Sequence, residues 1–494
     1  MSSTFYGFEI ARSGIVASQY ALNITGHNIT NADTDGYTRQ RLDTASISAV
    51  MGMQRLASTR AAIGGGVRVN GVEQIRDNYL DKQFREENSK TAYMSTLTTG
   101  LEDIETMFDA LSDTNISKTL SGFLSSLQDL ANNATDYEIR AEVQSKALEL
   151  TSSFNYYYTK LQDQQAVYDE SVNTVVAKIN ELGESIAELN KNIHTYELSG
   201  QTANDLRDQR NLMLDQLSGL IQIQYTETAT NGLTIQIDGR DFVSNAAFNK
   251  LSTTQTGNNP LTGTSDLNEV VWESDGASVD VAAGSLKAIM QLRDGNTQSE
   301  YGIAYMGGQI NKLVNALVTQ INTAHRTGWT LPNSANGNTS ATGVNFFDDF
   351  GGGQAITAGN FSLSAEILAS PYNIAASDTE ITDTNAGNNK NALSLVAMAN
   401  SNAIPDIESF QGFLTSTVSN LGIAVSYSKS MTAMQQALLK NKENSRISVS
   451  GVSIDEEVAN LIKFQHCYAA SARMMTTIDE MLDLMINRMG VVGR

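Results

Sequence analysis

Apolar side chains recur every three or four residues near both ends of the chain, as they do on one face of an amphipathic helix. The first stripe runs through Phe8, Ala11, Ile15, Ser18, Leu22, Thr25 and Ile29. The second runs through Leu461, Phe464, Tyr468, Ser471, Met475, Ile478, Leu482, Met485 and Met489. A seven-residue repeat of this kind predicts two terminal helices that form a coiled coil. The second helix should begin near Ser453, with Glu456 as a capping-box partner.

The middle of the chain carries a longer pattern of the same type. Between Val143 and Tyr196 only Gln164 and Ser171 interrupt the apolar stripe. At the rise of an α-helix, this segment would be about 80 Å long. Shorter helical patterns cover residues 78–109, 115–132 and 206–221. Together these patterns predict a long mid-chain helical bundle.

After Ile221 the apolar positions alternate with polar ones, which is typical of strands. Leu233–Ile237 alternates in this way and is followed by Asp238-Gly239, a sequence that favours a tight hairpin turn. Further strands are expected at 270–272, 279–281 and 360–368, and a loop or small β insert at 333–353. Helices are expected at 284–325 and 407–442. The predicted fold class is mainly α with a β insert. The terminal helices form a coiled coil, and one or more small β-rich domains lie on the outside.

Charge and composition exclude several classes of function. The 494 residues carry a formal net charge of −21, and an acidic chain is repelled by nucleic acid and by anionic lipid. The single cysteine, Cys467, excludes an internal disulfide. The first residues lack a basic region followed by an apolar run, so no cleaved secretory signal is expected. No apolar run is long enough to cross a membrane, so no membrane insertion is expected.

The sequence offers few candidates for catalytic chemistry. The four histidines have no short metal-ligand spacing, and the glycine triplets at 64–66 and 351–353 match no phosphate-binding motif. No pair of carboxylates is singled out as an acid and base. We therefore expect no enzyme activity, no cofactor and no metal site.

The terminal stripes instead indicate self-association or docking of a partner. Two amphipathic helices can bury part of each other, but a pair alone leaves apolar edges in water. Phe8, Ile15, Leu22 and Ile29 would then face Leu461, Tyr468, Met475, Leu482 and neighbouring subunits.

The patterns divide the chain into seven segments. They are an N-terminal assembly helix and turn (1–40), a helical domain with the long coiled-coil helix (41–221), a β-rich segment (222–282), a helical return (283–330), a loop or β insert (331–390), a second helical return (391–448) and a C-terminal assembly helix (449–494).

Two motifs near the ends resemble those of the axial proteins of bacterial flagella, which include rod, hook and hook-associated subunits. One is the segment 28–40, which contains Asn28, Asn31, Gly36 and Tyr37, and the other is the segment 449–465. His27, Thr30 and Asp35 stand where that family favours Asn, Ala and Pro. More narrowly, residues 284–294 and 322–328 resemble the hook-associated protein 1 family, which forms the hook–filament junction.

This resemblance implies a structural subunit of the bacterial flagellum, outside the cell at the hook–filament junction. It implies export by the type III apparatus without a cleaved signal, and an export chaperone that binds at the C-terminus. It also implies self-association in a ring, in contact with the hook protein and with the next hook-associated protein toward the filament. The candidate interface residues are Phe8, Ile15, Leu22, Asn28, Ile29, Asn31, Gly36, Tyr37, Leu461, Phe464, Tyr468, Met475, Ile478, Leu482, Met485 and Met489.

Three alternatives remain open from the sequence. Another axial subunit, a hook or distal rod protein, shares the end motifs, but hook-type subunits are mostly β between their ends, unlike Val143–Tyr196. A secreted coiled-coil adhesin would be favoured by binding of the middle segment to a host receptor. A hydrolase in the β insert would be favoured by a cleft that gathers carboxylates with perturbed pKa values.

Overall fold

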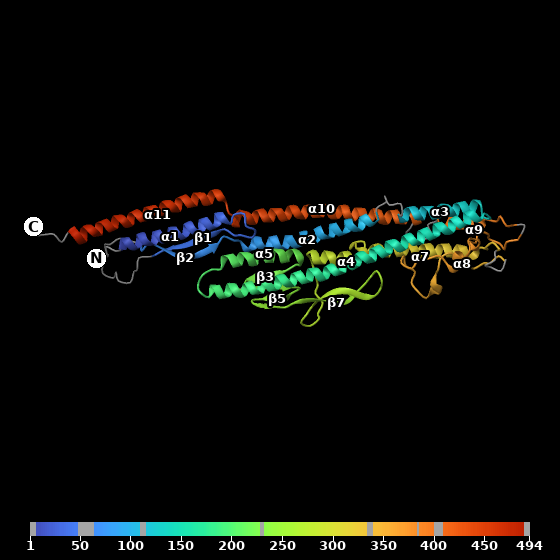
Figure 1. The fold of residues 1–494 in the computed structure, drawn as a ribbon, viewed down its shortest axis with the longest axis horizontal. Helices are drawn as coiled ribbons and strands as arrows, with labels where there is room; N and C mark the ends of the chain where they lie inside the picture. The colour runs from blue at the N-terminus through green and yellow to red at the C-terminus, as the bar shows by residue number, and fades with distance from the viewer. Residues whose placement is uncertain are drawn as a thin grey trace, which may run out of the picture. The chain divides into compact units, whose positions relative to one another are not determined.

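Long helices account for most of the chain (Figure 1). The computed structural model describes residues 6–47, 64–108, 115–227, 232–332, 339–382, 385–399 and 409–488. Within these residues the helices are accompanied by three small antiparallel sheets, which confirms the predicted class, mainly α with a β insert. The chain divides into two compact units. The first contains residues 1–91, 178–250 and 435–494, and the second contains 92–177 and 251–434.

The longest helix, α4 (Tyr137–Glu197), confirms the long mid-chain pattern. The predicted stripe is buried from Val143 to Leu161, but its middle shifts by one residue. The stripe predicted Gln164, Ser171 and Val175. The buried residues are instead Gln165, Val172 and Val176. The polar interruptions in the sequence therefore mark a change of phase, because a straight α-helix drifts out of a strict seven-residue repeat.

The first unit holds both terminal helices. It contains α1 (Tyr6–Thr30), β1 (Gln40–Ser46), β2 (Val67–Gln74), α5 (Asn204–Leu220) and α11 (Ile454–Asp483), with a π-helical turn at Leu484–Arg488. It also contains the first part of α2 (Asn78–Met107) and the last parts of α4 and α10 (Phe410–Ser450). Strand β1 pairs with β2, and the Val67 amide donates to Ser13 Oγ at 3.2 Å, which fixes this pair beside α1.

A four-stranded sheet completes the first unit. Its strands follow in the order β3 (Gln224–Glu227), β4 (Leu233–Ile237), β5 (Arg240–Ser244) and β6 (Ala247–Phe248). Asp238 and Gly239 have φ values of 50° and 71°, so they form the predicted hairpin turn. Gly183 of α4 lies against the sheet, since a Cβ there would come within 2.6 Å of Phe242 and Phe248.

The second unit is built around α3 (Ile116–Asn132), the first part of α4, and α7 (Ile303–Thr327). Its other elements are β7 (Leu251–Asn258), β8 (Ser265–Trp272), α6 (Ser285–Asp294), α8 (Ala365–Ala369) and α9 (Lys390–Ala399). Phe346 and Phe347 are fully buried and pack on Phe123, while Phe361 packs on Phe154. These rings join α3 and α4 to the segment that follows α7.

Several local predictions were wrong. Strands β1 and β2 were not expected, because the segment 41–221 was interpreted as a helical domain. The expected strand at 360–368 is a single bridge from Leu363 to Phe347 followed by α8, and 279–281 forms no strand. Helix α11 does begin after Ser453, but the Ser453 side chain makes no capping hydrogen bond. Met489 and residues 407–408 lie outside the described residues.

Candidate assembly interface

Helices α1 and α11 pack against each other and run antiparallel (Figure 1). A Cβ added to Gly7 would lie 3.2 Å from Ile478 Cδ1, and one added to Gly14 would lie 2.8 Å from Ser471 Oγ. Near the other end, Asn28 Nδ2 donates to Glu457 Oε2 at 3.1 Å. The contacts therefore move toward the N-terminus of α11 by as many residues as they move toward the C-terminus of α1.

The face of α1 that is buried consists of small residues. Its buried side chains are Ala11, Ser18, Ala21, Thr25 and Asn28. Small side chains let two helix backbones approach closely, and the near contacts at Gly7 and Gly14 have the same effect. We call this contact between α1 and α11 the seam.

The large apolar residues predicted for the interface are only partly covered. Phe8, Ile15, Leu22 and Ile29 are half-buried and each follows a seam residue directly in the sequence. On α11 the half-buried members are Leu461, Phe464, Met475, Ile478 and Leu482, while Tyr468 and Met485 are exposed. Met489 lies outside the described residues. The seam therefore leaves the flanks of both helices incompletely buried.

Other apolar side chains on these helices are exposed outright. On α1 they are Tyr6, Val16 and Tyr20. On α11 they are Ile454, Val458, Ile462, Tyr468, Met474 and Met481, and they continue into the π-helical turn with Leu484, Met485 and Ile486. Val458 and Ile462 are 44% and 49% exposed, and as residues four apart they lie on the same face of α11. Exposed apolar side chains in this number on two packed helices indicate a contact site for protein.

The side chain of the motif residue Asn28 makes all of its hydrogen bonds within the chain. Its Oδ1 accepts hydrogen bonds from Tyr37 Oη at 2.8 Å and from the Gln40 amide at 3.0 Å. Its Nδ2 donates to the Gln40 carbonyl at 2.9 Å and to Glu457. Arg39 donates to Glu457 through Nε at 2.9 Å and contacts the exposed Glu456 at the same distance. The motif thereby ties the end of α1 to the start of α11.

The other motif residues shape the turn that follows α1. Asn31 Nδ2 donates to the His27 carbonyl at 3.0 Å, which satisfies one of the last carbonyls of the helix. Gly36 has φ +79° and packs against Leu212 of α5, so a side chain would be strained there. Burial raises the pKa of Tyr37, and Asp205, Asp208 and Glu457 add to the rise.

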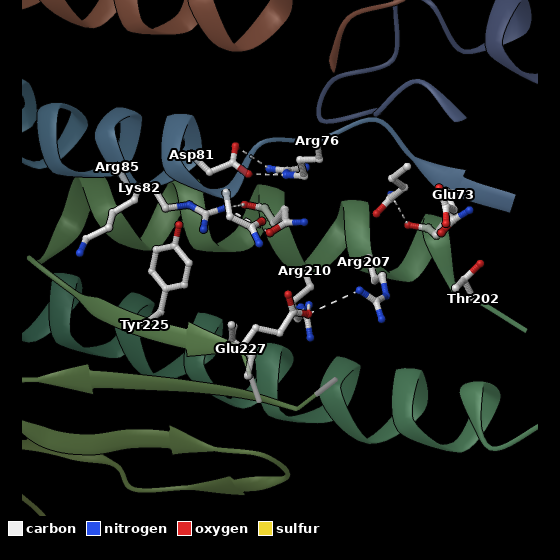
Figure 2. A pocket seen from close by; sticks show the side chains of 15 residues that line it. Glu73, Arg76, Asp81, Lys82, Arg85, Thr202, Arg207, Arg210, Tyr225 and Glu227 are labelled. Atoms are coloured by element: carbon white, nitrogen blue, oxygen red, sulfur yellow. Dashed lines mark hydrogen bonds and ion pairs between the residues drawn. The ribbon is translucent and has the colours of Figure 1, made fainter. Parts of the chain in front are cut away.

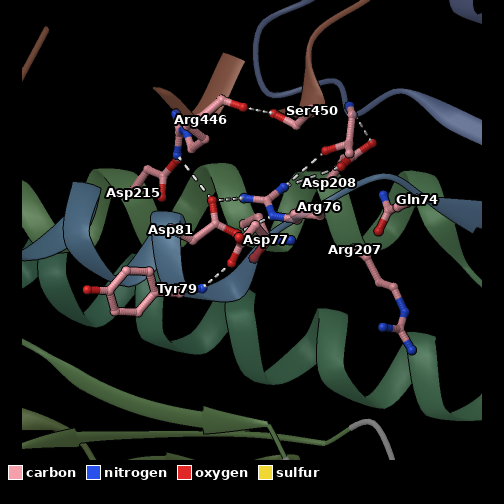
Figure 3. Close-up of polar contacts among 12 residues, drawn as sticks. Gln74, Arg76, Asp77, Tyr79, Asp81, Arg207, Asp208, Asp215, Arg446 and Ser450 are labelled. Atoms are coloured by element: carbon pink, nitrogen blue, oxygen red, sulfur yellow. Dashed lines mark hydrogen bonds and ion pairs between the residues drawn. The ribbon is translucent and has the colours of Figure 1, made fainter. Parts of the chain in front are cut away.

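A row of alternating acids and bases continues from this turn (Figure 3). Asp208 of α5 accepts from the Thr38 amide at 3.1 Å and lies 3.7 Å from Arg76, which donates to Asp81 at 2.5 Å. Burial raises the pKa of Asp208 to about 6, although its hydrogen bonds from Thr38 and the charge of Arg76 oppose the rise. Arg76 is shared with Asp81, so Asp208 lacks a full counter-charge.

The same row connects α10, α5 and α2. Arg446 near the end of α10 contacts Asp215 at 2.5 Å, and Arg85 of α2 donates to the other oxygen of Asp215 at 2.6 Å. The Arg85 guanidinium also lies 4.6 Å from the centre of the Tyr225 ring. No single stretch of sequence could reveal this network, because its members come from segments more than a hundred residues apart.

A cavity of about 470 Å³ lies beside this network (Figure 2). Its lining includes Arg76, Lys82, Arg85, Arg207 and Arg210. The arginines are compensated by neighbouring carboxylates, as in the pair of Arg210 and Glu227 at 2.7 Å. Among the described residues, no three His, Cys, Asp or Glu side chains gather as metal ligands do. The cavity is thus lined by a structural ion-pair network.

One motif of the second unit, at 284–294, binds together three elements. The Arg293 side chain is 2% exposed, and it donates to Asp169 of α4 at 2.6 Å and to the Asn268 carbonyl of β8 at 2.7 Å. Asp294 provides a second carboxylate at 2.6 Å. This arginine holds α6 to the long helix and to the β7–β8 pair.

The motif at 322–328 has a comparable role. The fully buried ring of His325 lies 2.7 Å from the Val344 carbonyl through Nδ1, and its Nε2 accepts from the Ala375 amide at 2.8 Å. Burial lowers the pKa of His325 to about 4. The neutral ring therefore carries its proton on Nδ1 and joins α7 to two later segments.

Comparison with known proteins matches three parts of the chain to families of flagellar proteins. The family described as "Flagellar hook-associated protein FlgK helical domain" matches residues 101–347. The C-terminal family of the flagellar basal body rod FlgEFG proteins matches 443–489, and the flagella basal body rod protein family matches 8–38. Among the described residues, no helix is long and apolar enough to cross a membrane.

Whole-chain relatives and one solved structure agree with these matches. Flagellar hook-associated protein 1 of Bacillus subtilis is 31% identical over 100% of both chains, and that of Salmonella typhimurium is 25% identical over 97% of this chain and 98% of the other. The fold is similar to that of the flagellar hook junction protein FlgK from Burkholderia pseudomallei. That similarity has a TM-score of 0.60 at 15% identity and covers 74% of this chain and 100% of the other. The chain belongs to the flagellar hook-associated protein 1 family.

Proposed function

We propose that this chain joins the flagellar hook to the filament as a structural subunit, and that it assembles into a ring through α1 and α11. The observation that carries this proposal is the apolar surface that the two helices leave in water after they have packed on each other. Val16, Tyr20, Val458, Ile462 and Met481 are all exposed. Assembly would give these side chains the apolar partners that one chain does not supply.

The candidate residues then divide into two roles. Phe8, Ile15, Leu22, Ile29 and their counterparts on α11 would contribute half-covered apolar surface to contacts between subunits. Asn28, Asn31, Gly36 and Tyr37 would act within a subunit, because their hydrogen bonds and close contacts are made inside the chain. Residues 1–40 and 449–494 would thus be the assembly segments, and the segments between them would lie outside the ring.

The partners follow from membership of a flagellar axial family, whose members associate with one another in the bacterial flagellum. We propose the hook protein on one side of the ring and the next hook-associated protein on the filament side. Before assembly, an export chaperone would cover the apolar surface of α11. The type III apparatus would then export the chain, without a cleaved signal, to the outside of the cell. The role is structural and involves no catalysis.

Electron microscopy of cells that lack the gene tests the proposal. We expect hooks without filaments, and flagellin in the medium. Restoring the full chain should restore filaments, whereas a chain without its last 30 or so residues should fold its second unit and still fail. Filaments of normal length on cells that lack the gene would contradict the proposal.

A further inference from the structure

The seam between α1 and α11 does not define its own alignment. Its small residues recur every seven positions on α1, as Gly7, Gly14 and Ala21 do and as Ala11, Ser18 and Thr25 do. A shift of one helix by seven residues therefore places another small residue opposite most of the α11 side chains in the middle of the seam. The packing of small residues is nearly the same after such a shift, which moves the helices by about 10 Å.

A buried polar contact at one end of the seam breaks this repeat. Asn28 and Glu457 are 1% and 2% exposed. All four hydrogen-bonding positions of the Asn28 amide are used, one of them by Glu457. The Glu457 carboxylate also holds Arg39, with a shortest N–O distance of 2.6 Å.

We propose that Asn28, Arg39 and Glu457 form a register lock, which sets the alignment of α1 on α11. After a shift of one heptad in one direction, Glu457 would face Ala21, and Asn28 would pass Ile454, where α11 begins. The buried Glu457 carboxylate would then lose both Asn28 and Arg39, and the Asn28 amide would lose one of its four hydrogen bonds. This loss is far more costly than exchanging one small residue for another. After a shift in the other direction, Asn28 would face Phe464, and Glu457 would lie beyond Thr30, where α1 ends.

The lock has a consequence for the apolar surface. The alignment fixes how far the exposed Val16 and Tyr20 of α1 lie along the pair from the exposed Val458 and Ile462 of α11. A wrong alignment would present each copy with a different surface and so impair a regular ring. This consequence rests on the proposed function, whereas the alignment is a property of a single chain.

The natural cysteine allows the alignment to be measured. Cys467 and Ser18 line the same groove and occupy facing positions of the seam. Ser18→Cys therefore reports the native alignment through an intramolecular disulfide or a short bis-maleimide crosslink with Cys467. Ala11→Cys and Thr25→Cys report shifts of one heptad in the two directions. Dilute chain is crosslinked, and peptide mass spectrometry identifies the pair.

With the lock intact, we expect Ser18→Cys to crosslink at least about tenfold faster than either of the other two variants. Adding Glu457→Leu should raise the rate for Ala11→Cys by at least about tenfold. Asn28→Leu should raise the rate for Thr25→Cys in the same way, because that shift places residue 28 opposite Phe464. This second variant guards against a folding defect of the first. Glu457→Gln keeps an acceptor for Asn28 and should retain the native alignment.

Glu456→Leu is the matched control, because Glu456 contacts the same Arg39 but is 63% exposed. It should leave the crosslinking rates unchanged. If Glu457→Leu and Asn28→Leu still crosslink only through Ser18→Cys, or lose all crosslinks, the three residues do not set the alignment. The rates are measured on the isolated chain, so they do not depend on whether the chain joins hook to filament.

Discussion

Acidification should selectively weaken the second unit through His325. The folded ring is neutral, and its two nitrogens are both engaged with backbone groups at 2.7 and 2.8 Å. A second proton would have to enter at Nε2, which accepts the Ala375 amide. Burial accordingly lowers the pKa of His325 from 6.5 to about 4.

The direction and the size of the change in stability follow from the difference between the folded and unfolded pKa values of His325. Between pH 6.5 and 4 the unfolded chain binds the proton and the folded chain does not, so stability is lost as the pH falls through this window. With these two pKa values, the loss between pH 7 and pH 5 is about 2 kcal/mol from this one residue.

Tryptophan fluorescence can isolate this effect. The chain has two tryptophans, Trp272 and Trp329, and both lie in the second unit. Urea unfolding followed by their emission should show a steeper loss of stability toward pH 5 in the natural chain than in His325→Gln. His194→Gln, an exposed substitution in the first unit, should behave like the natural chain. Equal pH dependence of the natural chain and His325→Gln would refute the assigned role.

Two further substitutions test the polar networks. Asp208→Asn should stabilise the first unit by about 3 kcal/mol at pH 7, because the folded pKa of about 6 lies above the ordinary 3.8 and ionisation costs stability as the pH rises. Thermal melting at pH 7 and pH 4 should show this gain only at the higher pH, and a loss at pH 7 would contradict it. Arg293→Met should lower the unfolding free energy of the second unit by about 3–5 kcal/mol, since Asp169 would lose its buried partner. Unchanged urea midpoints by tryptophan emission would argue against that role.

Amphipathic periodicity predicted most of the long helices, but the helix expected at 284–325 is two helices, α6 and α7. The stripe from Val143 to Leu161 is buried, and the hairpin turn at Asp238-Gly239 forms as its sequence indicates. These features depend on neighbours within one turn or one hairpin. Short-range spacing therefore contains the necessary information.

Strands β1 and β2 were missed because their stability comes from elsewhere. Their sequences, QRLDTAS and VRVNGVEQ, are mostly polar and have few buried positions. They are held by pairing with each other and by α1, so tertiary contact overrides a weak local preference.

The face of α1 that is buried was also not evident from its large residues. The predicted stripe contained the buried Ala11, Ser18 and Thr25, but its large members are only half-buried because close approach to α11 favours small residues. The register lock and the row of ion pairs could not be predicted from the sequence for another reason. Their partners, such as Asn28 and Glu457, lie hundreds of residues apart, and no periodicity relates them.

The role of the exposed apolar side chains of the terminal helices in assembly can be tested most directly by replacing them with charged residues. Cells that lack the gene would receive the natural chain, a Val458→Glu/Ile462→Glu variant, or a Leu198→Glu variant. Leu198→Glu is the control, because Leu198 lies outside the terminal helices and is 74% exposed. Flagella would then be counted by electron microscopy, and export would be checked in the medium. We predict filaments with the natural chain and with Leu198→Glu, and bare hooks with the double variant although it is exported. Normal filaments on cells with the double variant would contradict assembly through this surface.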